Sequence, residues 1–387
     1  MNGAMARVLL VSAAEDRYVR LNRLPLARAA REAGYDVALA CRISGYASEF
    51  EAAGLRLRPL SRLRRGSLGP WNEMRALFEL VSLYRAERPD IVHHFGMKTV
   101  LHGSIAARIA RVPYTVNTIT GLGYVFSSRT ARARMLRPFV RTALRLAFGG
   151  GDGMRVVVQN EDDRAFVAGL GIVPEKRVVL VPGSGVETGR FAPGPEPEGV
   201  PVVLFPSRLL RDKGVEEFVA AARLLRARGV AARFVLVGDR DPENPASVPA
   251  QTLHAWTNEG VVEHWGWRDD MPAVYAQASV VCLPSWREGM SRALLEAAAC
   301  GRAIVTCDVP GCRDVVADGA GVLVPARDPQ ALAQALATLL ADPAKRQALG
   351  VRARARALAE FSLERVVRDT LAIYAVGVEH ASAADAR

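Results

Sequence analysis

The chain has 387 residues, of which 50% are apolar and 24% are charged. This composition excludes a disordered or fibrous protein, and the length is sufficient for two or three domains with full cores. No apolar run approaches the ~18 residues of a membrane span. The start, MNGAMARVLLVSAAEDR, has too short an apolar core for a signal peptide and predicts a β-strand instead.

The net charge of +11 is distributed unevenly along the chain. Residues 1–185 contain 28 Lys and Arg against 15 Asp and Glu, whereas the remainder contains 23 against 25. All of the basic excess therefore lies in the first half. This asymmetry indicates an anionic partner there, which could be nucleic acid, a phosphorylated substrate or a membrane surface.

The first half alternates strand-like and helix-like segments. Apolar, β-branched runs predict buried strands at residues 7–13, 35–41, 89–96, 114–120 and 154–160. Helical patterns lie between them, as in LPLARAAREAG and GSIAARIA. This alternation predicts a parallel sheet covered by helices on both faces.

A segment rich in Pro and Gly, PGSGVETGRFAPGPEPEGVP, separates the two halves. The alternation then restarts, with strands predicted at residues 202–208, 233–239, 261–267, 279–285, 302–308 and 321–327. Between the last two strands, residues 308–321 predict a turn that contains Gly and a short helix. We therefore expect two doubly wound Rossmann-like domains facing across a cleft. The predicted boundaries are an N-terminal domain at 1–183, a linker at 184–200, a C-terminal domain at 201–360 and a final helix at 361–380.

The first candidate binding motif is PSRLLRDKG, which directly follows a predicted strand. Arg208 and Lys213 lie on this loop at the carboxyl end of the sheet, where open α/β sheets bind ligands. Two such cations can hold a diphosphate, Arg with its planar fork and Lys as a point charge. Taken alone, the motif is more typical of two solvated loop cations.

The second candidate is the sequence REGMSRALLEAAACG. Ser291 is placed to cap the alanine-rich helix, and EGM, with Gly289 and Met290, leads the backbone to the helix N-terminus. The free amides and dipole at that terminus suit an anion such as a diphosphate. Glu288 then lies outside the helix and Glu296 one turn inside it. A simpler interpretation of Glu296 is an ordinary helix glutamate.

A weaker signal is GWRDDMPAVYAQA, a strand end followed by a turn and a helix. It could present Trp267 to the base of a nucleotide, although a packed aromatic is the better explanation of this residue taken alone.

Other patterns argue against a metal or a nicotinamide cofactor. The five cysteines form no C-x-x-C pair, so we expect reduced thiols in the cytoplasm. DRD at 239–241 and RDD at 268–270 resemble metal-binding acidic motifs but have no supporting context, and we interpret them as turns. VVLVPGSGVETG lacks the G-x-G-x-x-G spacing of a dinucleotide site.

Together these motifs resemble glycosyltransferase family 4, the retaining GT-B transferases, through nearly the whole chain. Glu288 to Glu296 matches the E-x7-E motif of that family, and Arg208 to Gly214 matches its R-x4-K-G motif. The resemblance implies that Arg208 and Lys213 hold the donor diphosphate, with help from the amides around Gly289 to Ser291. It also implies that Glu288 contacts the donor sugar, that Glu296 contacts the ribose, and that no metal or other cofactor is needed.

On the acceptor side, the first half is similar to the branch of that family that acts on lipid-linked saccharides. The candidate residues come from PDIVHHFG and NTITGLGYVF and are His93, His94, Asn117, Thr120 and Gly121. Many relatives have a His directly before this Gly, where the present chain has Thr120, which argues against a histidine role at that position. For His93 and His94, a buried ring satisfied by neighbouring groups is as good an explanation as a functional one.

The segment RMLRPFVRTALRLAF places Arg134, Arg137, Arg141 and Arg145 on one helical stripe. Such a basic amphipathic helix suits the anionic inner face of the cytoplasmic membrane. The alternative is a helix packed on the core with a solvated arginine face. A nucleic-acid partner fits less well, because no binding motif accompanies the charge.

The sequence therefore predicts a hexosyltransferase that moves a sugar, of the N-acetylhexosamine type, from a UDP-sugar to a polyprenyl-diphosphate-linked saccharide. Such a reaction belongs to bacterial lipopolysaccharide or capsule biosynthesis. We expect the protein in the cytoplasm, peripherally attached to the membrane. Two alternatives remain, a nucleotide-sugar epimerase of GT-B fold and a catalytically idle GT-B module in an assembly complex.

Overall fold

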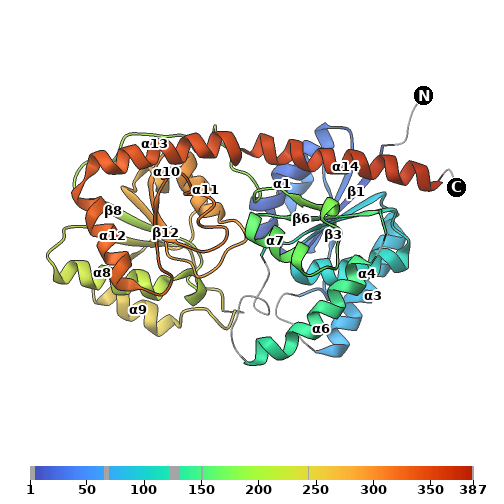
Figure 1. The fold of residues 1–387 in the computed structure, drawn as a ribbon, viewed down its shortest axis with the longest axis horizontal. Helices are drawn as coiled ribbons and strands as arrows, with labels where there is room; N and C mark the ends of the chain where they lie inside the picture. Colours follow the sequence, from blue (N-terminus) through green and yellow to red (C-terminus); the bar gives the residue numbers. More distant parts are fainter. Residues whose placement is uncertain (1–4, 65–68, 122–130, 150, 243, 386–387) are drawn as a thin grey trace. The chain divides into compact units, whose positions relative to one another are not determined.

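The computed structural model describes residues 5–64, 69–121, 131–149, 151–242 and 244–385 (Figure 1). It divides into two compact units. The first comprises Met1–Ser184 together with Val366–Arg387, and the second comprises Gly185–Arg365.

The described strands of the first unit form a parallel sheet in the order β3-β2-β1-β4-β5-β6-β7. The central strands are buried on both faces because helices cover both faces. The strands are β1 (Arg7–Glu15), β2 (Asp36–Arg42), β3 (Arg56–Pro59), β4 (Ile91–Phe95), β5 (Tyr114–Thr118), β6 (Met154–Val158) and β7 (Val178–Leu180).

Successive residues of β1 reach two different cores, one on each face of this sheet. Val8 and Leu10 pack in the core under α1, whereas Leu9 and Val11 pack in the core under α3 and α4. The helices are α1 (Asp16–Glu32), α2 (Ala47–Ala52), α3 (Pro70–Glu87), α4 (Met97–Ala110), α6 (Ala131–Phe148) and α7 (Glu161–Gly169), and a 3₁₀ turn, η1, spans Glu175–Arg177. Helix α4 packs against both α3 and α6, so these three helices form one layer.

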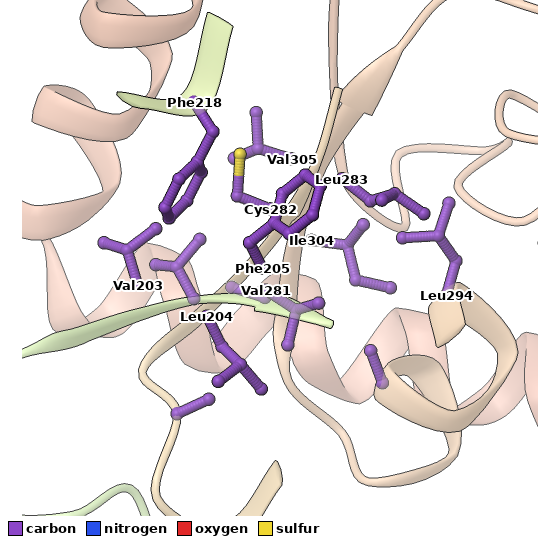
Figure 2. Close-up of a cluster of buried hydrophobic side chains, with 14 of the residues drawn as sticks. Val203, Leu204, Phe205, Phe218, Val281, Cys282, Leu283, Leu294, Ile304 and Val305 are labelled. Carbon is purple, nitrogen blue, oxygen red and sulfur yellow. The ribbon is translucent and has the colours of Figure 1, made fainter. Parts of the chain in front are cut away.

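The second unit repeats this plan with the strand order β10-β9-β8-β11-β12-β13, again all parallel. Its strands are β8 (Val202–Pro206), β9 (Arg233–Val237), β10 (Glu263–His264), β11 (Val280–Leu283), β12 (Ala303–Cys307) and β13 (Val322–Val324). Its helices are η2 (Arg211–Lys213), α8 (Val215–Ala227), α9 (Ala250–Asn258), α10 (Met271–Ala276), α11 (Arg292–Ala299), α12 (Pro329–Ala341) and α13 (Pro343–Glu360). Figure 2 shows the core where Phe205, Cys282 and Ile304 of three adjacent strands meet Phe218 and Leu294 of the covering helices.

The strands predicted from the sequence are confirmed, although their ends differ. Strand β1 extends two residues further than predicted, to Glu15, β2 is shifted by one residue, and the other predicted strands are shorter at one or both ends. The short helix expected between residues 308 and 321 is wrong, since that segment is a run of turns. The backbone is left-handed at Gly311, Asp318 and Gly319, with φ of 75°, 56° and 73°, so a right-handed helix cannot continue through it. Strand β3 and helices α3 and α9 were not predicted.

Residues 184–200, predicted as a linker, are held against the second unit from Gly185 onward. Val186 pairs with Ser362, and the Phe191 side chain is buried. The Arg354 guanidinium donates hydrogen bonds to the carbonyls of Thr188 and Phe191 at 3.1 and 2.9 Å. The segment is irregular because of its Pro and Gly content, but its backbone is anchored.

Helix α14 (Leu363–Asp385) passes from the second unit to the first, where the sequence led us to expect a returning helix at 361–380. Its residues from Val366 onward belong to the first unit, and Ile373 and Tyr374 are buried in the core that also contains Val8 and Leu10.

All five cysteines are buried free thiols. Burial raises the pKa of the Cys41 and Cys300 thiols to about 12, so both remain protonated and unreactive. Across the described ranges, no helix is long and apolar enough to cross a membrane, and no cluster of three His, Cys, Asp or Glu side chains could hold a metal ion.

We predict that Gly377→Leu lowers the stability of the first unit. Any Cβ at Gly377 would lie 2.7 Å from Tyr114 Cδ1 and 2.9 Å from Ile91 Cδ1, so α14 would have to move away from the sheet. Overpacking of this kind costs about 1–3 kcal/mol. The free energy of unfolding measured in urea tests this, with Ala375→Leu on the exposed side of the same helix as the control. Equal losses in the two variants would contradict the close packing of α14.

Candidate active site

The loops that follow β8, β9, β10, β11 and β12 meet at the carboxyl edge of the second sheet, because parallel strands all end there. Main-chain hydrogen bonds join them in pairs. Gly238 N donates to Gly266 O at 2.8 Å, Trp286 N donates to Asp212 O at 2.9 Å, and Ser291 N donates to Gly311 O at 3.4 Å. The edge is therefore a continuous backbone framework that carries the predicted donor-site residues.

Lys213 and Glu288 form an ion pair at this edge. Lys213 Nζ donates to Glu288 Oε1 at 2.6 Å, and the side chains are only 16% and 12% exposed. Lys213 ends the 3₁₀ turn η2, and Glu288 lies in the loop after β11. The two candidates are 75 residues apart in sequence, and the structure brings them into direct contact.

Gly214 makes this contact possible. It follows Lys213 in a left-handed conformation with φ of 78°, and a Cβ atom there would lie 2.1 Å from the carbonyl oxygen of Pro284. Only glycine allows the turn that carries Lys213 to approach the loop that carries Glu288 so closely.

Arg208 follows β8 and donates from Nη1 to Asp241 Oδ2 at 2.6 Å. Asp241 lies in the loop after β9, the strand next to β8 in the sheet. Sequence analysis interpreted DRD at 239–241 as turn residues and missed this pairing. The signal that could have found it is the predicted adjacency of the two strands, which places their following loops side by side.

Helix α11 begins as predicted. Ser291 is its N-cap and accepts a hydrogen bond from Leu294 N at 3.5 Å, which satisfies one of the amides of the first turn. Gly289 is buried, whereas Met290 is half-buried against the core of the unit. The first turn of α11 thus begins directly after the Glu288 loop.

Glu296 lies one turn inside α11 and is buried, with partners at both carboxylate oxygens. Arg292 Nε donates to Oε1 at 2.7 Å, and the Tyr275 hydroxyl lies 3.1 Å from Oε2. Burial raises the pKa of Tyr275 well above its usual value, so the hydroxyl stays a neutral donor. Sequence analysis missed Tyr275, because nothing in the local pattern links α10 to Glu296.

Trp267 is half-buried in the turn after β10. The carbonyl of the neighbouring Gly266 accepts a hydrogen bond from the amide of Gly238, in the loop after β9. This turn therefore lies at the same edge of the sheet as Arg208. A second aromatic, Trp286, was not predicted. Its indole donates to Glu217 Oε1 at 3.1 Å, and the Arg327 guanidinium carbon lies 4.0 Å above its ring.

The acceptor-side candidates lie in the first unit on β4 and β5. His93 and His94 are adjacent on β4 and point to opposite faces of the sheet. His93 bonds through Nδ1 to the Tyr374 hydroxyl and through Nε2 to Thr118 Oγ1, both at 2.6 Å. It lines a small cavity together with Asn22, Arg23, Thr118, Ser184 and Thr370, whereas His94 lies beneath α3 and α4.

His94 belongs to a buried hydrogen-bond network. Because Asn117 Oδ1 accepts from Ser104 Oγ at 2.9 Å and from His94 Nδ1 at 2.7 Å, the proton of the neutral ring is on Nδ1. His94 Nε2 then accepts from the Tyr84 hydroxyl at 3.0 Å. Burial lowers the pKa of His94 to about 4 and the pKa of His93 well below its usual value. His94 and Asn117 are therefore explained by packing and hydrogen bonding inside the first unit.

Thr120 and Gly121 lie just beyond β5. Thr120 is exposed, and Gly121 has a left-handed backbone with φ of 115°. The rest of the GLGYVF motif, residues 122–126, lies outside the described residues. Of the acceptor candidates, the structure thus places Thr120 at the surface and His93 beside a cavity.

Two doubly wound α/β units in one chain constitute the GT-B fold of glycosyltransferases. The structure superposes on the crystal structure of HepE from Anabaena in complex with UDP with a TM-score of 0.75 and 18% sequence identity, covering 96% of this chain and all of that one. Both halves of the chain match glycosyltransferase families. Residues 200–342 match the family described as glycosyl transferases group 1, and residues 7–149 match the family described as glycosyl transferase 4-like.

Two bacterial transferases are similar over most of the chain. The N,N'-diacetylbacillosaminyl-diphospho-undecaprenol alpha-1,3-N-acetylgalactosaminyltransferase of Campylobacter jejuni is 27% identical over 334 residues, 83% of this chain and 86% of that protein. The UDP-Gal:alpha-D-GlcNAc-diphosphoundecaprenol alpha-1,3-galactosyltransferase of Escherichia coli is 28% identical over 290 residues, 72% of each chain.

We predict that stability falls as the pH drops from about 6.5 towards 4. His94 is neutral in the folded state down to a pKa of about 4, but it takes up a proton at about 6.5 when the chain unfolds. The His94 contribution to the free energy of unfolding therefore falls by about 1.4 kcal/mol per pH unit between these values, or about 3 kcal/mol in total. His93, whose pKa is also lowered by burial, makes the total slope steeper.

Urea unfolding at several pH values measures this slope, and His94→Gln should reduce it by the contribution of about one proton. His254→Gln, on an exposed helix position, controls for the loss of one histidine. A His94→Gln slope identical to that of the unmodified chain would show that His94 is not buried in its neutral form.

Proposed function

We propose that this protein is a retaining hexosyltransferase that transfers a sugar, of the N-acetylhexosamine type, from a UDP-sugar to a polyprenyl-diphosphate-linked saccharide. The observation that carries the proposal is the Lys213–Glu288 ion pair at the carboxyl edge of the second sheet, directly before the N-terminus of α11. This arrangement brings a cation, a helix dipole and a carboxylate together. The cation and the dipole suit the diphosphate of a nucleotide sugar, and the carboxylate suits the hydroxyls of its sugar.

The donor diphosphate is held by positive charge on two sides in this proposal. Lys213 and Arg208 supply cations from the loops of η2 and β8, and the first-turn amides of α11 supply hydrogen bonds together with the positive end of the helix dipole. These groups stabilise the negative charge that develops on the leaving UDP, so we propose that no metal ion is needed.

The carboxylates bind the neutral parts of the donor. Glu288 accepts hydrogen bonds from hydroxyls of the transferred sugar. Glu296 accepts hydrogen bonds from the ribose after one of its present partners, Tyr275 or Arg292, gives way. Trp267 lies on the side of the base, at the turn after β10.

Retention follows if the acceptor attacks the face from which the phosphate leaves. The acceptor oxygen bonds to the anomeric carbon as the bond from that carbon to the phosphate oxygen breaks, and the electron pair departs with UDP. The acceptor proton passes to the same phosphate oxygen, so no protein nucleophile is required. The cations at Lys213 and Arg208 favour this path because they stabilise the departing phosphate.

The acceptor class is supported by the two relatives, whose names specify undecaprenol-diphosphate-linked saccharides. It is also supported by the basic excess of residues 1–185. Arg137, Arg141 and Arg145 lie on α6, with Arg141 and Arg145 exposed. We propose that the first unit places the enzyme on the inner face of the cytoplasmic membrane, where it takes part in surface-polysaccharide assembly.

Lys213→Ala should lower kcat/KM for transfer by a factor of about 100 to 1,000, as expected for removal of one preorganised charge donor. Glu288→Gln should cause a similar loss. Arg211→Ala, in the same 3₁₀ turn but exposed and paired with Glu216, is the matched control and should remain near the activity of the unmodified chain. Normal turnover in both folded site variants would contradict the assignment.

The donor nucleotide is tested by thermal unfolding with UDP, GDP or ADP, each in the presence of EDTA or of magnesium. A ligand that binds only the folded state stabilises it by about 2.7 kcal/mol at a hundredfold excess over Kd. We expect UDP alone to raise the Tm, equally with EDTA and with magnesium. A Tm shift with GDP or ADP alone would show that the donor sugar carries that nucleotide and not UDP. A shift that requires magnesium would contradict the proposal that no metal ion is needed.

A further inference from the structure

Helix α3 of the first unit carries an exposed apolar ridge. Trp71, Met74 and Phe78 are 73%, 48% and 66% exposed. Their spacing of three and four residues places them on one face, on successive turns. Large aromatic side chains are normally mostly buried, and several exposed ones gathered together mark an interaction surface.

The ridge is not needed for the packing of α3. The opposite face of the helix supplies that packing through Ala76, Leu80 and Tyr84, which are buried in the core shared with β1 and α4. The ridge residues are therefore surplus to the fold of the first unit as described.

The acidic side chains of α3 are all engaged by the protein itself. Glu73 pairs with Lys98 at 2.8 Å and lies 2.9 Å from His102 Nε2. Glu87 pairs with Arg56 at 3.0 Å and with Arg58 at 2.5 Å, and Glu79 accepts the backbone amides of residues 61–63 at 2.8–3.2 Å. Cations of the first unit thus balance the charges of Glu73 and Glu87, and backbone amides stabilise the carboxylate of Glu79.

The charges left around the ridge are positive. Arg75 is exposed on the same helix and lies beside the ridge, one turn after Trp71. Arg62 and Arg64 are exposed in the preceding segment, which the contacts of Glu79 hold next to Phe78. An apolar ridge flanked by arginines is complementary to a bilayer surface with anionic headgroups.

The neighbouring helices extend this surface. Helix α4 lies between α3 and α6, and Figure 1 shows the three helices on the same side of the first unit. Helix α6 exposes Met135 and Leu146 beside the exposed Arg141 and Arg145.

We propose that the α3 ridge is a membrane anchor, in which Trp71, Met74 and Phe78 insert into the interfacial layer of an anionic bilayer while Arg62, Arg64 and Arg75 contact its headgroups. This proposal deepens the proposed function and rests on it for the identity of the membrane, since a lipid-linked acceptor lies in a bilayer. In this proposal the ridge binds lipid and not a second copy of the chain.

The test is cosedimentation of the full chain with phosphatidylcholine vesicles, with and without phosphatidylglycerol. We expect binding only when phosphatidylglycerol is present, and the double variant Trp71→Ser with Phe78→Ser should require at least about tenfold more lipid for half-maximal binding. The matched control is Val351→Ser with Leu358→Ser, which removes two exposed apolar side chains from α13 of the second unit and should leave binding unchanged.

Insertion can also be measured directly, because Trp71 is the only tryptophan in residues 1–184. Brominated acyl chains should quench part of the tryptophan fluorescence of the unmodified chain, and Trp71→Phe should abolish this quenching. Undiminished vesicle binding by the double variant, or persistent quenching in Trp71→Phe, would overturn the proposal. So would sedimentation velocity showing a dimer that the double variant converts to a monomer.

A failure of the membrane-anchor proposal can be distinguished from a failure of the proposed function. Vesicle binding requires neither donor nor acceptor, and transfer to a short-chain, water-soluble acceptor requires no membrane. We expect the double variant to retain transfer to such an acceptor. Loss of transfer to that acceptor together with normal vesicle binding would reject the anchor, because the ridge would then act in the reaction and not on the membrane.

Discussion

The candidate active site depends on a backbone lock between two loops of the second unit. The carbonyl of Asp212 accepts a hydrogen bond from the amide of Trp286, and Gly214 lies directly against the carbonyl of Pro284. These main-chain contacts hold the turn before α8 against the loop after β11, and the contact between Lys213 and Glu288 follows from them. The site is therefore organised before any ligand arrives, which reduces the ordering that binding would otherwise require.

The site cations already have carboxylate partners, Lys213 with Glu288 and Arg208 with Asp241. A charged group that is largely removed from water needs such a partner, because an unpaired charge there is costly. In the proposed reaction, the donor diphosphate therefore replaces these carboxylates as the partner of the two cations. Affinity then depends on the difference between the two sets of ion pairs, and a carboxylate released from its cation becomes free to accept hydrogen bonds from sugar hydroxyls.

The sequence predicted most strands, the Ser291 cap and the placement of the donor motifs at strand ends, because each depends on local pattern or on the common direction of parallel strands. Asp241 and Tyr275 were missed because their partners, Arg208 and Glu296, are 33 and 21 residues away and no local pattern links them. The turns after β12 were mistaken for a helix because composition does not reveal left-handed backbone at a non-glycine such as Asp318. Local signals therefore located the motifs, whereas the pairings within the site required the tertiary structure.

The path of α14 has a consequence for synthesis on the ribosome. The second unit is continuous from Gly185 to Arg365, whereas the first unit takes Ile373 and Tyr374 into the core under its earliest strands. Domains usually fold in the order in which they are made. Here the earlier-made unit lacks part of its core until residues 366–374 have left the exit tunnel, so the later-made unit is the first that can fold completely. During elongation, the nascent first unit presents the apolar groove that α14 will fill, and this interval is when chaperones would have most to protect.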